Sequence, residues 1–291
     1  MKKILLIASG GDAPGINDFI YHLWQSFSTK DIEFHYSPYG ARSLWKNDIK
    51  KIDVKNINYL LDIPTSIIGC GRFPEIVGNE EILAQTIENA KQFEHVVLLG
   101  GNGSYELAKT LSRNGVNISF VPLTVDNDVD YTIQTLGFST ALNTVVESIN
   151  RIYYSVNAHG YVSLVEIMGR NCPDLTELSL KLSHADLAVT NNPLKTPKEF
   201  AKEVKKIYDE KGTATILVME KMKYSIQEYA DEISKFGIPT RPNILGHIQR
   251  GGRTTVGDKI LAYEFAKAIQ KSIRKHESIA TGKNIKIKLE K

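Results

Sequence analysis

The chain has 291 residues, 42% apolar and 24% charged, which is an ordinary globular composition and long enough for two α/β lobes. Its 36 basic and 33 acidic side chains are well mixed, and no basic block predicts a nucleic-acid partner. No apolar run approaches the ~20 residues of a membrane helix, and Cys70 and Cys172 form no paired motif. We therefore expect a cytoplasmic protein with reduced thiols that binds neither nucleic acid nor membranes.

Short apolar runs alternate with helical patterns along the chain. The runs are β-branched or leucine-rich without clean alternation, which is typical of parallel strands covered on both faces. The expected strands are residues 3–9, 95–101, 118–125, 162–168 and 214–220. The expected helices are Ile16–Phe27, Glu80–Gln92, Tyr105–Arg113, Thr140–Tyr153, Pro197–Glu210, Tyr224–Phe236 and Lys259–Lys275. This alternation predicts an α/β fold with doubly wound, mainly parallel sheets.

Glycine-rich loops follow the first two strands. The first strand runs into Gly10-Gly11-Asp12 and the second into Gly101-Asn102-Gly103-Ser104. In open parallel sheets ligands bind beyond the carboxyl ends of the strands, where glycine loops that lead into helices cradle phosphates. A tight turn without a ligand would explain one such loop. Two at one sheet edge predict a phosphate site.

The third strand leads into an acidic segment, in which Asp126, Asp128 and Asp130 surround Asn127. One carboxylate beside a phosphate loop can hold Mg²⁺, and another can take the proton from an attacking hydroxyl. A ligand-free Asx-rich turn is the weaker alternative, because the segment follows a buried strand. The segment predicts metal support and a general base.

Basic side chains supply the counterpart of these carboxylates. Arg72, Arg170 and the stretch that contains Arg241, His247 and Arg250 have the composition of an anion clamp. Each arginine alone would more often be a solvated surface charge. Together with the acidic segment they indicate phosphoryl transfer, which needs positioning and charge neutralisation.

In chain order, the motifs SGGDAPGIN, GGNGSYELA, TVDNDVD, VEIMGR and LGHIQRGG resemble those of the bacterial-type 6-phosphofructokinases. The resemblance implies the phosphofructokinase fold, with two Rossmann-like domains. Residues 1–138 and 251–291 would bind the nucleotide, and residues 139–250 the sugar phosphate. It also implies transfer of the γ-phosphoryl group of ATP to the 1-hydroxyl of fructose 6-phosphate, a step of glycolysis, with Mg²⁺ as cofactor. The expected assembly is a homo-oligomer, either a tetramer or a dimer.

The same resemblance implies a role for each matching residue. The residues that match the nucleotide site are Gly11, Arg72, Phe73, Gly101, Asn102, Gly103 and Ser104. In the TxDxD motif, Thr124 and Asp126 would be catalytic, with Asp126 as the base, and Asp128 would organise the metal together with Asn102. The residues that match the sugar-phosphate site are Thr124, Asp126, Asp128, Met168, Gly169, Arg170 (also catalytic), Glu220, Arg241 (donated by a neighbouring subunit), His247 and Arg250.

Departures from the family motifs keep alternatives open. Asn102 stands where the family has a Mg²⁺-associated aspartate, and Tyr161 where it has another 6-phosphate arginine. Both replacements are expected to weaken activity, and a weakly active or inactive paralogue that acts as a binding or regulatory subunit is the alternative. A pyrophosphate-dependent phosphotransferase is less favoured, because Gly103 is of the ATP type. Tyr21 and Gln25 replace effector-site arginines, which predicts weak control by nucleoside diphosphates.

Overall fold

The computed structural model describes residues 1–27, 32–53, 57–63 and 65–290, and the chain forms two compact units. Unit 1 comprises Met1–Thr124, Val129–Gly137 and Arg253–Lys291, and unit 2 comprises Val125–Asp128 and Phe138–Gly252. The sequence had assigned residues 125–128 to the first domain, and that assignment is wrong. This segment belongs to unit 2, where the Asn127 side chain donates a hydrogen bond to Asp174.

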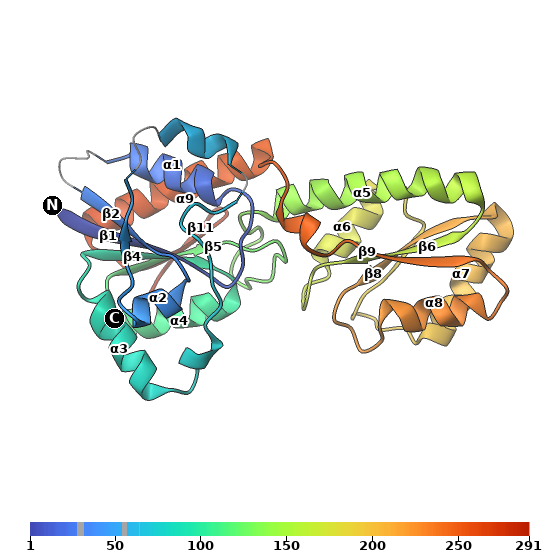
Figure 1. Cartoon of the computed structure of the whole chain (residues 1–291), viewed down its shortest axis with the longest axis horizontal. Coiled ribbons are helices and arrows are strands. Elements are labelled where there is room, and N and C mark those ends of the chain that lie inside the picture. The colour runs from blue at the N-terminus through green and yellow to red at the C-terminus, as the bar shows by residue number, and fades with distance from the viewer. Residues whose placement is uncertain (28–31, 54–56, 64, 291) are drawn as a thin grey trace. The chain divides into compact units, whose positions relative to one another are not determined.

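Among the described residues, unit 1 contains a seven-stranded sheet in the order β11-β10-β5-β4-β1-β2-β3 (Figure 1). The strands are β1 (Lys2–Ser9), β2 (Ile32–Ser37), β3 (Lys50–Lys51), β4 (His95–Gly100), β5 (Ile118–Pro122), β10 (Ile279–Gly282) and β11 (Ile285–Lys288). The five inner strands are parallel, and β3 and β11 pair antiparallel at the two edges.

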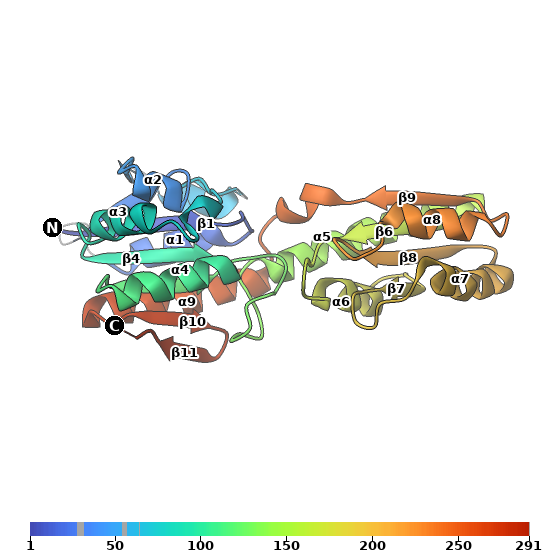
Figure 2. The ribbon, with the colours of Figure 1, turned by 90° about the horizontal axis from the view of Figure 1, so that it is seen from below.

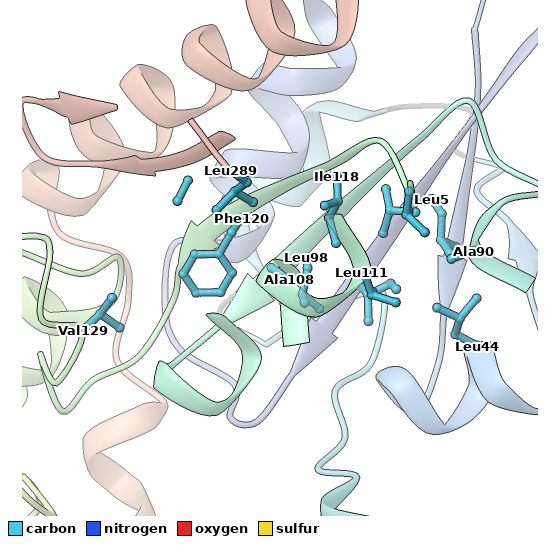
Figure 3. Packing of buried hydrophobic residues seen from close by; sticks show 14 residues of the cluster. Leu5, Leu44, Ala90, Leu98, Ala108, Leu111, Ile118, Phe120, Val129 and Leu289 are labelled. Carbon is cyan, nitrogen blue, oxygen red and sulfur yellow. The ribbon is translucent and has the colours of Figure 1, made fainter. Parts of the chain in front are cut away.

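Helices cover both faces of this sheet. They are α1 (Ile16–Gln25), α2 (Ala41–Trp45), α3 (Glu80–Ala90), α4 (Asn102–Arg113) and α9 (Val256–Lys275), with short 3₁₀ turns η1 (Ile57–Asp62) and η2 (Pro74–Ile76). α1 packs on α9 on one face, and α3 and α4 lie on the other (Figures 1 and 2). Every residue of β4 and β5 is buried, and their side chains pack with Ala108 and Leu111 of α4 (Figure 3).

Unit 2 has a four-stranded parallel sheet within the described part of the chain, in the order β7-β8-β6-β9. Its strands are β6 (Val162–Ile167), β7 (Leu187–Val189), β8 (Ala214–Met219) and β9 (Thr240–Ile244), and its helices are α5 (Phe138–His159), α6 (Asp174–Leu182), α7 (Pro197–Lys211) and α8 (Ile226–Ser234). A 3₁₀ turn, η3 (Gly246–Arg250), follows β9. α5 packs with α6 on one face of the sheet, and α7 packs with α8 on the other (Figure 1).

Local sequence sets where the helices of unit 2 begin. α7 and α8 each start with a capping box, Thr196 with Glu199 and Ser225 with Glu228, in which side chain and backbone satisfy each other's hydrogen bonds. The predicted α/β class with mainly parallel sheets is confirmed. Within the residues described, none of the helices combines the length and the apolar character needed to cross a membrane.

Candidate active-site residues

In unit 1, the carboxyl ends of the neighbouring strands β1, β4 and β5 lie side by side. The register pairs Ser9 with Gly100 and Gly100 with Pro122, so the loops after these strands start at the same level. The Ser104 hydroxyl donates to the Ser9 carbonyl oxygen at 2.6 Å and ties the start of α4 to the first loop. A Cβ on Gly100 would overlap that same carbonyl, so the approach requires glycine. The structure thus brings together the two predicted glycine loops.

The second of these loops is also the first turn of α4. The helix begins at Asn102, three residues earlier than expected, because the Gly101 carbonyl accepts hydrogen bonds from the N–H groups of Ser104 and Tyr105 at 3.0 and 3.1 Å. Gly101 has no side chain to cap the helix, and the first turn holds no acidic residue. A Cβ on the exposed Gly103 would meet no atom within 4 Å. This helix start suits an anionic ligand, since its dipole is not offset by a carboxylate.

Arg72 and Phe73 have different environments. The exposed Arg72 side chain donates from Nε to the Gly10 carbonyl oxygen at 2.7 Å, so it lies against the loop that also contains Gly11. The Phe73 ring is buried and stacks on Trp45, with 5.5 Å between the ring centroids. Of this pair, only Arg72 is brought to the glycine loop, whereas Phe73 belongs to a hydrophobic cluster with Ala41 and Ile76.

Asp126 is the carboxylate around which charged residues of unit 2 gather. It is 9% exposed, and burial raises its pKa, while the nearby charge of Arg250 lowers it, that of Glu220 raises it and that of Arg170 lowers it. The Glu220 N–H donates to the Ile167 carbonyl oxygen at 2.8 Å, which sets the end of β8 beside the end of β6. Three residues predicted from separate motifs therefore lie within electrostatic range of Asp126.

Two residues near this group were missed by the sequence analysis. The buried Gln249 accepts a hydrogen bond from the Met168 N–H at 3.0 Å and donates one to the Gly246 carbonyl oxygen at 3.0 Å, so it fastens η3 to the end of β6. Lys221 is a further charge that lowers the pKa of Asp126. Gln249 could have been suspected from its place in LGHIQRGG, whereas no pattern singles out Lys221.

Arg241, His247 and Arg250 do not form one cluster in unit 2. Arg241 pairs in register with Ser163 near the start of β6, whereas η3, with the exposed His247 and with Arg250, follows the opposite end of β9 (Figure 2). The Arg241 guanidinium carbon lies 4.6 Å above the centroid of the buried Tyr161 ring. Because β9 carries Arg241 away from Arg250, the three side chains of one chain do not form a clamp together, and Arg241 remains a predicted contribution from a neighbouring subunit.

The two proposed metal donors, Asn102 and Asp128, belong to different units, and Thr124 belongs to the same unit as Asn102. Thr124 follows β5 in unit 1, where its N–H donates to the Leu136 carbonyl oxygen at 3.1 Å. Asn102 belongs to unit 1 and the half-buried Asp128 to unit 2. No group of three or more His, Cys, Asp or Glu among the described residues could hold a metal. Amide and carboxylate oxygens are each of the hard type that Mg²⁺ takes together with phosphates and water.

The chain matches a family model and a curated relative over most of its length. The family model described as Phosphofructokinase matches residues 3–273. The chain is 36% identical over 270 residues to an ATP-dependent 6-phosphofructokinase from Photobacterium profundum, covering 90% of this chain and 82% of the relative.

Two solved structures share the fold. A chain of phosphofructokinase from Saccharomyces cerevisiae superposes with a TM-score of 0.87 and 23% identity over 99% of this chain, which spans only 45% of that longer chain. Pyrophosphate-dependent phosphofructokinase from Nitrosospira multiformis gives a TM-score of 0.84 and 19% identity, covering 96% of this chain and 79% of that one. Since a protein named for pyrophosphate as its donor shares this fold, the fold alone does not decide the phosphoryl donor.

Proposed function

Because the chain belongs to the phosphofructokinase family, we propose that it transfers the γ-phosphoryl group of ATP to the 1-hydroxyl of fructose 6-phosphate, a step of glycolysis. The observation that carries this proposal is the buried Asp126 carboxylate among Arg250, Glu220 and Arg170. The donor follows from the relatives, since curated proteins 33–36% identical to this chain are named ATP-dependent 6-phosphofructokinases. Kinases of this type are transferases whose catalysis is largely positioning and charge neutralisation.

Unit 2 binds the acceptor sugar phosphate. Asp126 accepts the proton of the 1-hydroxyl as that oxygen attacks phosphorus, and the raised pKa makes its carboxylate a stronger base. Arg170 supplies positive charge at the phosphoryl group in transfer, where electrostatic stabilisation contributes most. The groups proposed to bind the sugar and its 6-phosphate are Met168, Gly169, Glu220, His247 and Arg250. Gln249 is a positioning residue that fixes the Met168 backbone.

Unit 1 binds the nucleotide. The proposed contacts are Gly11, Arg72 and the turn Gly101–Ser104. The paired carboxyl ends of β1 and β4 hold the two glycine loops next to each other. Thr124, at the end of β5, contacts the substrates from this unit. Mg²⁺ bound with ATP supplies charge neutralisation at the phosphates, and Asn102 and Asp128 would hold it.

A homo-oligomer is also proposed, a tetramer or a dimer. In unit 2, Arg241 lies near the start of β9, whereas Arg250 follows the end of that strand. An arginine turned away from the base of its own chain can serve the 6-phosphate site of a neighbour. Light scattering measures the assembly directly, and a monomer that is fully active at high dilution would contradict this part of the proposal.

Substitution of Asp126 tests the role of the base. Asp126→Asn keeps the shape of the side chain but cannot accept a proton, so kcat should fall by ~10²–10⁴-fold with a much smaller change in KM. Asp130→Asn is the matched control, since Asp130 is an exposed carboxylate of the same acidic segment. An Asp126→Asn enzyme with normal kcat and raised KM would move the base elsewhere.

A further inference from the structure

Asn127 lies between the base and the proposed metal-supporting residue, and its conformation is unusual. Its backbone has φ 56°, in the left-handed region that few residues other than glycine adopt. Its Nδ2 donates to Oδ2 of Asp174 at 2.7 Å. A hydrogen bond to an ionised carboxylate is among the stronger side-chain bonds in proteins. The segment that carries Asp126 is thus anchored at its central residue.

Asp174 is the first residue of α6 and lies just beyond the turn that carries Arg170. This turn is tight, because the Cys172 N–H donates to the Gly169 carbonyl oxygen at 2.7 Å and a Cβ on Gly169 would lie 2.6 Å from the Cys172 carbonyl oxygen. Arg170 itself has φ 48°. The nearby carboxylate of Asp174 adds to the effect of burial, which raises the pKa of the Cys172 thiol to about 11.

Asp174 therefore holds the segment of the base by a hydrogen bond and directly follows the turn of the arginine. The two elements come from distant parts of the sequence, and Asp126 and Arg170 are close enough for the arginine's charge to lower the pKa of the aspartate. Phosphoryl transfer depends on such groups being held in a narrow range of positions, and an error of about 1 Å can cost ~10²-fold in rate.

We propose that the Asn127–Asp174 hydrogen bond is a positioning pair, which sets Asp126 relative to Arg170 for phosphoryl transfer. Neither residue needs to touch a substrate for this role. The inference rests on the proposed function, because a positioning pair has meaning only in an enzyme that performs the reaction. It also explains why an asparagine, and not the less constrained glycine, occupies the left-handed position.

Asn127→Gly is the most informative variant. Glycine adopts φ 56° without strain, so the backbone is spared while the side-chain bond to Asp174 is lost. Asp174→Ala removes the same bond from the other side, and Asp174→Asn can restore it through its amide oxygen. Glu177→Ala, an exposed acidic residue in the same first turn of α6, is the matched control for an effect on the helix alone.

The experiment measures kcat, both KM values and the urea midpoint for these variants and for the double variant Asn127→Gly/Asp174→Ala. We expect kcat to fall ~10–100-fold in each single variant, with KM for ATP unchanged, while Asp174→Asn and Glu177→Ala stay within ~3-fold of wild type. The double variant should be no slower than the slower single one, because both changes remove one interaction.

Three results would contradict the proposal that Asn127 and Asp174 form a positioning pair. These are an Asn127→Gly enzyme with wild-type kcat, losses that multiply in the double variant, or a Glu177→Ala enzyme as slow as Asp174→Ala. If Asp174→Ala is too unstable to assay, Asn127→Gly and Asp174→Asn decide the matter. A wild-type protein without sugar-phosphate kinase activity would instead refute the proposed function, and the two failures are therefore distinct.

Discussion

Mild acid is expected to destabilise unit 1 through His95, the first residue of β4. The side chain is fully buried, and its Nε2 lies 2.8 Å from the Ser119 hydroxyl, which in turn lies 2.8 Å from the hydroxyl of Ser272. Its Nδ1 has no hydrogen-bond partner among the described residues. Burial, with a smaller effect of the charge on His276, lowers the pKa of His95 to about 3. The folded protein thus holds this ring neutral.

The size of the effect follows from the two pKa values, the ordinary 6.5 in the unfolded chain and about 3 in the folded one. Between these values the unfolded state binds a proton that the folded state rejects. Because the folded pKa is the lower one, the stabilising contribution is complete above pH 6.5 and is lost as the pH falls. At about 1.36 kcal/mol per unit, the free energy of unfolding should drop by about 2 kcal/mol between pH 6.5 and 5 from this residue alone.

Urea unfolding of wild type and His95→Gln at pH 7, 6 and 5 measures this contribution. Both tryptophans of the chain, Trp24 and Trp45, belong to unit 1, so their fluorescence follows the unit that contains His95. Wild type should lose about 2 kcal/mol more than His95→Gln over this range, since all other titrating groups cancel in the comparison. His276→Gln, at an exposed neighbour with the smaller effect on the pKa of His95, should change the pH dependence far less than His95→Gln does. Parallel curves for wild type and His95→Gln would refute the reasoning.

Two further predictions concern the residues that depart from the family motifs. Tyr161→Leu removes the ring under Arg241 and should raise KM for fructose 6-phosphate ~3–30-fold with little change in kcat. Tyr161→Phe keeps the ring and should resemble wild type. Equal KM values for the two variants would exclude the cation–π contact as a source of affinity. Asn102→Asp should raise kcat and steepen the dependence of kcat on Mg²⁺, because the variant adds a carboxylate at the start of α4. Titrations of wild type and variant with Mg²⁺ measure this dependence. A variant that is no faster than wild type at any Mg²⁺ concentration would contradict the prediction.

The sequence was most informative where burial is uniform. β1, β4, β5, β6 and β8 were all predicted, because each is an apolar run covered on both faces. β9 was missed, since its residues are largely exposed, it contains Pro242, and it lies at the edge of its sheet. The hairpin of β10 and β11 was missed as well, because strands of four residues are too short to carry a clear periodic signal.

The same contrast holds for the candidate site. Asp126, Arg170, Glu220 and Arg250 could be predicted because each follows a strand or lies in a motif, and the strands bring them together. The separation of Arg241 from that group depends on the register of β9 against β6, which no local pattern encodes.

The contacts of Gln249 and Asp174 likewise arise only from tertiary packing. Gln249 meets the Met168 backbone across 81 positions of the chain, and Asp174 meets Asn127 across 47. Hydrogen bonds over such sequence separations leave no spacing or periodicity by which the partners could be recognised. The partners in these contacts could be identified only once the fold was known.

The most direct test of the proposed kinase activity is the identity and amount of the product. The purified protein is incubated with fructose 6-phosphate, Mg²⁺ and either ATP or pyrophosphate, and phosphorus NMR follows donor and product. We predict fructose 1,6-bisphosphate and ADP in equal amounts with ATP, and far slower product formation with pyrophosphate. ATP that is stable in the presence of the sugar phosphate, or product formed faster from pyrophosphate, would contradict an ATP-dependent sugar-phosphate kinase.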